Sequence, residues 1–301
     1  MKVSVLIPTY NSEPHLSECL DSVLAQDFAD MEILLTDDGS TDQTAKIIET
    51  YAVRDARIRW WQNPANLGIV GNHNEILRRA QGDYVKFLHA DDKLLAPYAL
   101  SKMAVTLEEN PSVVLVGCRQ HLTGAKSRPL IFSNRSGRFD GKRMIVASLE
   151  QNTNLIGQPS LTMFRRRAAQ RGFDPRFTGH LDFEMWCCLL EQGDFFYLAE
   201  DLATWRVHGN QQTARHEKHR IAEHEHLLFM QEFLAKPWLQ NAATQRMWFA
   251  QTYYLRKKYG AQADSVIATM QEKLAPGSYS WQLLKHKCAR PLQNLAQKIR
   301  S

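Results

Sequence analysis

Residues 32–42, with the sequence EILLTDDGSTD, pass from an apolar run into a pair of acids and a turn. The apolar run at 32–36 indicates a buried strand. Ser40 and Gln43 have the spacing of a capping box, which predicts a helix from that point to about residue 52. The segment therefore predicts one strand–turn–helix unit with two carboxylates at the end of its strand.

Similar units lie on both sides of this segment. Strand-like apolar runs occupy residues 3–7, 57–61 and 84–88, and helical patterns occupy residues 16–24 and 72–80. This alternation predicts an α/β fold of Rossmann-like type, in which helices flank a mostly parallel sheet.

The acidic pairs Asp37-Asp38 and Asp91-Asp92 each follow a predicted strand. Because ligands of such folds bind at the carboxyl ends of the strands, we expect the two pairs to share one site. A divalent metal that bridges a diphosphate would explain Asp91-Asp92, since two adjacent carboxylates repel each other without a cation. A helix N-cap is the alternative for this pair. The first pair fits either a contact to a nucleotide base or ribose, or a turn.

Beyond about residue 118 the pattern is less regular. Residues 119–140 are rich in Arg, Ser and Gly, which predicts an irregular segment. Further elements are expected as helices near 142–150 and 181–190, strands at 161–164 and 195–198, and a helical, charged region from 214 to the end.

Two further groups of polar residues are candidates for catalytic or binding roles. Asp182 and Glu184 lie at the start of a predicted helix, where either could act as a general base or merely as a first-turn acid. Arg206 and His208 alternate in a stretch that is expected to be extended. Arg neutralises phosphate and His binds metals, although an Arg-x-His pair is also common as a structural feature.

The bulk composition is that of a globular protein. The 301 residues are 44% hydrophobic and 23% charged, and the net charge of +5 suits nucleotide phosphates or acidic lipids without requiring nucleic acid. The 5 cysteines form no CxxC pair, which argues against a disulfide framework and a zinc site. We find no signal peptide pattern and no membrane-spanning run, and we expect a cytoplasmic protein.

The order of these motifs resembles glycosyltransferase family 2. The matching segments are VSVLIPTYN at 3–11, LDSVLAQ at 20–26, TDDGSTD at 36–42, GDYVKFLHADD at 82–92, and shorter matches at 66–68, 159–166, 172–174, 182–186 and 206–208. The resemblance covers residues 2–213. It implies a GT-A fold and an enzyme that transfers a sugar from a nucleotide sugar with inversion of the anomeric carbon.

The resemblance also implies roles for individual residues. The residues implied to bind the nucleotide sugar are Pro8, Thr9, Tyr10, Asp37, Asp38 and Asp91. Asp91, Asp92 and His208 would hold Mn²⁺ or Mg²⁺, which offsets charge on the leaving diphosphate. Asp182 would deprotonate the acceptor hydroxyl.

The implied catalytic domain spans residues 1–213. Its nucleotide-sugar half is 1–118, its acceptor half with the catalytic base is 119–213, and a helical C-terminal region follows at 214–301.

Three positions depart from the family pattern. Many relatives carry Asp where this chain has His89, Glu where it has Leu181, and Arg where it has His73. The first departure leaves Asp91 and Asp92 as the expected metal carboxylates. The second alters the surroundings of the predicted base, and the third removes a cation that would contact the diphosphate.

The expected partners are a UDP-, GDP- or dTDP-sugar and a glycan or lipid-linked acceptor in bacterial surface polysaccharide synthesis. The basic tail at 285–300 fits a solvated helix, or a peripheral contact with anionic lipid on the inner face of the membrane. A catalytically inactive nucleotide- or sugar-binding module is the alternative function. A sugar nucleotidyltransferase and a dehydrogenase are disfavoured because no Gly-rich phosphate loop follows the first strand.

Overall fold

The computed structural model describes residues 3–124, 132–209, 221–234, 236–239, 245–264 and 266–268. An eight-stranded sheet with the order β3-β2-β1-β4-β8-β5-β9-β7 forms its centre, and β10 and β6 form a separate pair. The strands are β1 Val3–Thr9, β2 Met31–Asp37, β3 Ile58–Gln62, β4 Tyr84–Phe87, β5 Val113–Cys118, β6 His121–Gly124, β7 Gly137–Phe139, β8 Thr162–Arg165, β9 Asp194–Leu198 and β10 Thr204–Val207.

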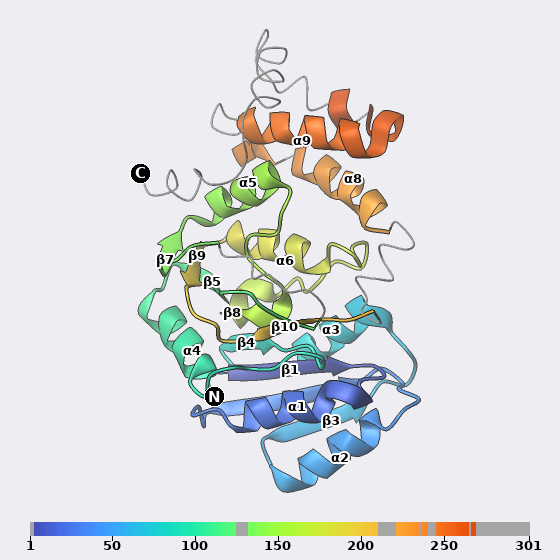
Figure 1. The fold of residues 1–301 in the computed structure, drawn as a ribbon, viewed down its shortest axis with the longest axis vertical. Helices are drawn as coiled ribbons and strands as arrows, with labels where there is room; N and C mark the ends of the chain where they lie inside the picture. Colours follow the sequence, from blue (N-terminus) through green and yellow to red (C-terminus); the bar gives the residue numbers. More distant parts are fainter. Residues whose placement is uncertain are drawn as a thin grey trace.

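The helices lie on both faces of the large sheet (Figure 1). They are α1 Glu13–Leu24, α2 Thr44–Arg54, α3 Gly68–Arg79, α4 Ala99–Glu109, α5 Gly141–Gln151, α6 Leu181–Leu190, α8 Ile221–Leu234 and α9 Gln245–Tyr259. The predicted α/β class with a large sheet flanked by helices is confirmed.

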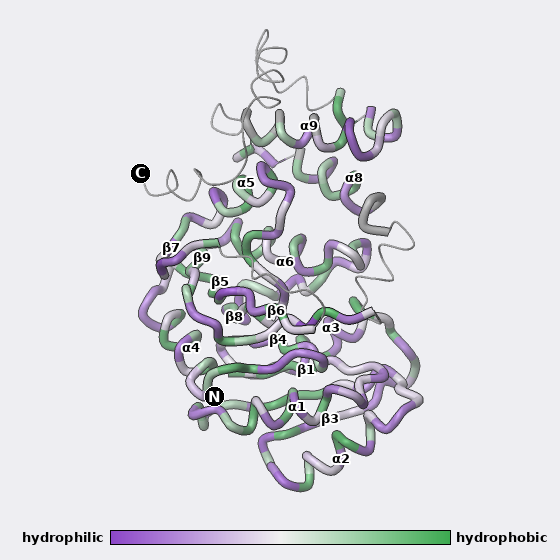
Figure 2. Tube along the Cα trace, in the orientation of Figure 1, coloured by the Kyte–Doolittle hydropathy of each residue, from purple (hydrophilic) through white to green (hydrophobic). Residues whose placement is uncertain are grey.

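Strands β1 to β4 are parallel, as predicted, whereas β8 runs antiparallel to both β4 and β5. Alternate residues of β1 explain why both faces are covered. Leu6 belongs to a hydrophobic cluster shared with α3, α5, α6, α8 and α9, while Val5 and Ile7 belong to a cluster shared with α1, α2 and α4. In Figure 2 the hydropathy changes every few residues along the helices, as it does in amphipathic helices.

The structure corrects two local predictions. The capping box is wrong: α2 begins at Thr44 after Gln43, without a side-chain cap, and the Ser40 hydroxyl instead donates to Asp37. The segment 119–140, predicted to be irregular, contains β6 and β7. These strands are short and find partners in β10 and β9, far away in the sequence, so local pattern carried little sign of them.

The C-terminal helices pack on the body of the molecule. Helix α9 contacts α5 (Figure 1). Phe229 of α8 and Leu255 of α9 are buried in the same hydrophobic cluster as residues of the sheet. Among the described helices, none combines the length and apolar character that a bilayer crossing needs. The basic tail at 285–300 lies outside the described residues.

Candidate active site

A cleft of about 1140 Å³ opens at the carboxyl ends of β1, β2 and β4. The sequence-predicted residues that line it are Pro8, Thr9, Tyr10, Asp38, Asp91, Asp182 and His208. Asp37 and Asp92 lie behind the lining, and both are buried. The polypeptide thus brings sequence-predicted residues from position 8 to position 208 together at one site.

Asp38 holds the loop that leads into α3. Its Oδ1 accepts hydrogen bonds from Asn63 Nδ2 at 2.8 Å and from the Leu67 backbone N at 2.9 Å, and its Oδ2 accepts from Gly68 N at 3.0 Å. Gly68 has a φ of +72°, a conformation that glycine adopts without strain. Asp38 therefore shapes this wall of the cleft.

Asp37 stabilises the turn after β2. Its carboxylate accepts from the Ser40 backbone N at 3.2 Å and from Gln62 Nε2 at 2.9 Å, and the side chain is fully buried. These contacts match the turn interpretation of this residue. Tyr10, by contrast, lines the cleft and is 46% exposed.

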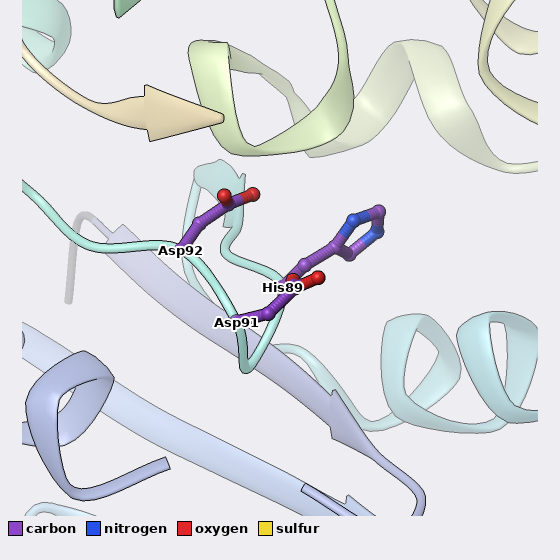
Figure 3. Close-up of side chains that lie close together, drawn as sticks. All are labelled: His89, Asp91 and Asp92. Carbon is purple, nitrogen blue, oxygen red and sulfur yellow. The ribbon is translucent and has the colours of Figure 1, made fainter. Parts of the chain in front are cut away.

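Three side chains after β4 form a candidate metal centre (Figure 3). One potential ligand atom from each of His89, Asp91 and Asp92 lies within 4.8 Å of the others. Asp92 is 2% exposed; its Oδ1 accepts from Arg206 N at 2.7 Å, while Oδ2 has no hydrogen-bond partner among the described residues. A buried carboxylate oxygen without a partner is costly, and a cation would satisfy it.

The charge state of Asp92 leads to the same conclusion. Burial and the nearby Asp91 carboxylate raise the pKa of Asp92 to about 8 when no cation is present. Two close carboxylates in a buried place resist simultaneous ionisation, and a divalent ion reverses that preference. The residues therefore fit a divalent metal.

His89 is held in one orientation by His73. His73 Nδ1 lies 2.7 Å from the Ile69 carbonyl oxygen and so carries the proton, which leaves its Nε2 as an acceptor. His89 Nε2 lies 3.1 Å from that atom and must be the donor, so the lone pair of His89 is on Nδ1. Burial lowers the pKa of His73 to about 3 and also lowers that of His89, which keeps both rings neutral. A neutral imidazole whose other nitrogen is hydrogen-bonded is the usual form of a metal ligand.

His208 reaches the same place from the segment after β10. Its Nε2 lies 3.1 Å from Asp91 Oδ2, and its ring centroid is 5.4 Å from that of His15. The family resemblance implied His208 as a metal ligand together with Asp91 and Asp92, whereas His89 was not among the implied ligands. The departure from Asp at position 89 was visible in the sequence, and a histidine there still offers a metal-binding atom.

Asp182 lies in the first turn of α6 and faces the cleft. Its Oδ2 accepts from Asn154 Nδ2 at 3.2 Å and its Oδ1 from the Phe183 backbone N at 2.8 Å. Burial raises its pKa above the ordinary value. Glu184, the other acid of this turn, is instead paired with Arg171 at 2.7 and 2.5 Å. The structure thus leaves Asp182 as the acid of α6 that is available to a ligand.

The C-terminal helices build a part of the cleft that was not predicted from the sequence. His226 of α8 and Gln251 and Tyr254 of α9 line the same cleft as Asp182. Among the described residues of the lining, none is Lys or Arg. The carboxylates of that lining are Asp38, Asp91 and Asp182.

Comparison with known proteins identifies related sequences. The model of glycosyl transferase family 2 matches residues 4–173. EpsJ of Bacillus subtilis, an uncharacterized glycosyltransferase, is 39% identical over 116 residues, which cover 38% of this chain and 33% of EpsJ. The GalNAc(5)-diNAcBac-PP-undecaprenol beta-1,3-glucosyltransferase of Campylobacter jejuni is 29% identical over 201 residues, covering 65% of this chain and 62% of that enzyme. The chain thus spans about a third of EpsJ and under two thirds of the Campylobacter enzyme.

Solved structures share the fold. Residues 1–349 of TarS from S. aureus, in complex with UDP-GlcNAc, superpose with a TM-score of 0.67 at 20% identity, covering 90% of this chain and 79% of that one. The mannosyltransferase PcManGT of Pyrobaculum calidifontis, in complex with GDP-Man and Mn²⁺, gives a TM-score of 0.60 at 17% identity and covers 98% of this chain and 78% of that one.

Proposed function

The chain belongs to glycosyl transferase family 2, and we propose that it transfers a sugar from a nucleoside-diphosphate sugar to an acceptor hydroxyl, with inversion of the anomeric carbon. The observation that carries this proposal is that one cleft is lined both by His89 and Asp91 of the candidate metal cluster and by Asp182, a carboxyl group whose pKa is raised. The proposed catalytic domain is residues 1–213, divided at 118 into donor and acceptor halves and followed by the helical region 214–301.

The donor end is the wall formed by the ends of β1 and β2. Tyr10 offers its exposed ring to the base, and Pro8, Thr9 and Asp38 form the surface beneath it. Asp37 supports this surface through its turn. Complexes of TarS with UDP-GlcNAc and of PcManGT with GDP-Man support a nucleotide sugar as the donor class.

The diphosphate requires positive charge, and the described lining supplies no Lys or Arg for it. We therefore assign a divalent metal, Mn²⁺ or Mg²⁺, to the cluster of His89, Asp91 and Asp92, with His208 held against Asp91. The ion would act as a Lewis acid on the leaving nucleoside diphosphate. Because one donor is an imidazole nitrogen, which Mg²⁺ binds poorly, the site favours Mn²⁺.

Asp182 is the proposed base. Inversion requires the acceptor oxygen to attack the anomeric carbon on the face opposite the diphosphate, and a base on that face takes the hydroxyl proton. The proton moves from the acceptor hydroxyl to the Asp182 carboxylate while the bond from the anomeric carbon to the diphosphate breaks. Desolvation raises the pKa of Asp182, which makes its carboxylate a stronger base than an exposed aspartate.

The acceptor is proposed to be a glycan or a lipid-linked glycan of bacterial surface polysaccharide. The name of the Campylobacter relative, which specifies an undecaprenol-linked acceptor, supports this class. A cytoplasmic enzyme that docks on the inner face of the membrane through its basic tail would meet such acceptors.

Calorimetric titration with UDP, GDP and dTDP, each with and without Mn²⁺, tests the donor site. The wild type is expected to bind one nucleotide in a Mn²⁺-dependent way, and Asp91→Asn is expected to weaken that binding at least tenfold, whereas Asp83→Asn, an exposed acid outside the cleft, leaves it unchanged. Binding of no nucleotide, or equal binding without metal and in Asp91→Asn, would contradict the proposal. Tight nucleotide binding without any sugar transfer would favour an inactive binding module.

A further inference from the structure

The C-terminal helices build one end of the cleft. His226, Gln251 and Tyr254 line it together with residues 178–183, the segment that contains Asp182. Glu225, next to His226 on α8, joins the two walls: its Oε1 accepts from Thr178 N at 2.8 Å and Thr178 Oγ1 at 2.7 Å. Its Oε2 accepts from the backbone N of Gly179 at 2.7 Å and of His180 at 3.0 Å. The wall from α8 is therefore fixed relative to the proposed base.

The rings on this wall are ordered by contacts with one another. The His226 ring centroid lies 5.3 Å from that of His180 and 5.5 Å from that of Tyr254. His226 Nε2 lies 3.3 Å from Gln251 Oε1, and the Gln251 amide nitrogen donates to the Leu149 carbonyl oxygen and to Asn152 Oδ1. Since these two acceptors fix which end of the Gln251 amide is nitrogen, His226 donates through Nε2.

The side chains that line this end are mainly polar and aromatic. Amide side chains of Asn152, Asn154 and Gln158 line it beside the partly buried rings of Phe183 and Tyr254. Burial lowers the pKa of His226 to about 3, so that its ring is neutral. Asp182 is the one carboxylate among the described residues that line this end, and the His180 ring beside it favours the ionised form of that carboxyl group. Lys258 lies just outside, with Nζ at 2.9 Å from the Tyr254 hydroxyl.

We infer that the space between Asp182 and the wall of His226, Gln251 and Tyr254 is the acceptor subsite, and that it takes an uncharged saccharide. Amides and imidazoles match sugar hydroxyl groups as donors and acceptors, and aromatic rings pack against the C–H face of a sugar ring. A carboxylate- or phosphate-bearing sugar would meet the Asp182 carboxylate, and the described lining of the cleft holds no Lys or Arg to offset that repulsion. The inference rests on the proposed function, because Asp182 is taken as the base.

Saturation-transfer NMR on the full chain with Mg²⁺ and UDP or GDP tests this inference. The probes are p-nitrophenyl glycosides of glucose, galactose and N-acetylglucosamine, with p-nitrophenyl glucuronide as the charged comparison. We expect signal from at least one neutral glycoside and none from the glucuronide. Tyr254→Ala should weaken binding of that glycoside at least tenfold. It should leave the nucleotide signal unchanged, because Tyr254 belongs to α9 and not to the segments after β1 and β2 that form the donor wall. Tyr98→Ala, at an exposed tyrosine outside the cleft, is the matched control and should change neither signal.

The outcomes separate the two proposals. Three results that include a nucleotide signal would overturn the acceptor subsite alone. These are the absence of any glycoside signal, a glucuronide signal equal to that of the neutral glycosides, and a glycoside signal that Tyr254→Ala leaves unchanged. A glycoside signal that depends on Tyr254, with no nucleotide signal, supports the subsite and contradicts the donor assignment. Absence of both signals overturns both.

Discussion

Replacing Glu225 with Gln is expected to destabilise the protein in a pH-dependent way. Burial acts to raise the pKa of Glu225, but the contacts with His180, Thr178 and Gly179 outweigh it and lower the pKa from 4.5 to about 2. At 1.36 kcal/mol per pKa unit, this lowering corresponds to at most about 3 kcal/mol of stability. Because the segment borders an open cleft, where solvent screens part of the interaction, we expect about 2 kcal/mol.

The sign follows from the depressed pKa. The contribution of Glu225 is fully present above the unfolded-state value of 4.5 and is lost as the pH falls toward about 2. The free energy of unfolding should therefore differ between wild type and Glu225→Gln by about 2 kcal/mol at pH 7, and the difference should shrink below pH 4.5.

Urea denaturation of the full chain from pH 3 to pH 7, followed by circular dichroism, measures this difference. Glu232→Gln is the matched control on the same helix, since Glu232 is 39% exposed and pairs with Arg176 at the surface. Glu232→Gln should lower the free energy of unfolding by less than about 0.5 kcal/mol. A cost of Glu225→Gln below about 0.5 kcal/mol at pH 7, or one that does not change with pH, would refute the reasoning.

Three other changes test the site and the fold. Asp182→Asn should lower kcat by about 10²- to 10⁴-fold with nucleotide binding intact. Because the base must be ionised, the wild-type kcat/KM should rise with pH through a value above the ordinary aspartate pKa of 3.8. A pH-independent rate would argue against this base. His89→Asp should shift metal preference from Mn²⁺ toward Mg²⁺ in calorimetry, whereas an unchanged preference would remove His89 from the ligand set. Gly82→Ala should cost about 1–3 kcal/mol in urea denaturation, because its Cβ would lie 2.6 Å from the Ser4 backbone N. Gly137→Ala, where the nearest atom is 4.0 Å away, should be near neutral, and equal costs at the two positions would contradict the packing argument.

Most of the donor half could be predicted from the sequence, because it is built from strand–turn–helix units whose residues are neighbours in the chain. Strands β1, β2 and β4 are mostly apolar and are each closely followed by polar residues of the site, so the strand and the site residue are close to each other in the chain. Asp38 and Asp91 could therefore be placed at one sheet edge without knowledge of tertiary contacts.

The acceptor half depends on long-range contacts that no local pattern reveals. Glu225 meets residues 178–180 some 45 positions earlier, and Gln251 meets Asn152 across 99 positions. His89 was recognised as a departure from Asp, but its value as a ligand depends on the hydrogen bond to His73, which orients its free nitrogen. The capping box was misread because the Ser40 hydroxyl donates to Asp37 and accepts from the Asn11 backbone N, so that it does not accept from the first turn of α2.

The most direct test of the central claim is a ¹H NMR assay of sugar transfer. The nucleotide sugar whose nucleotide binds in calorimetry, with Mn²⁺ present during the reaction and chelated before the spectrum, is incubated with the neutral p-nitrophenyl glycosides. We predict a new glycoside whose anomeric coupling shows the configuration opposite to that of the donor, and no product from Asp182→Asn. A product with retained configuration, or undiminished product from Asp182→Asn, would contradict inverting transfer by this residue.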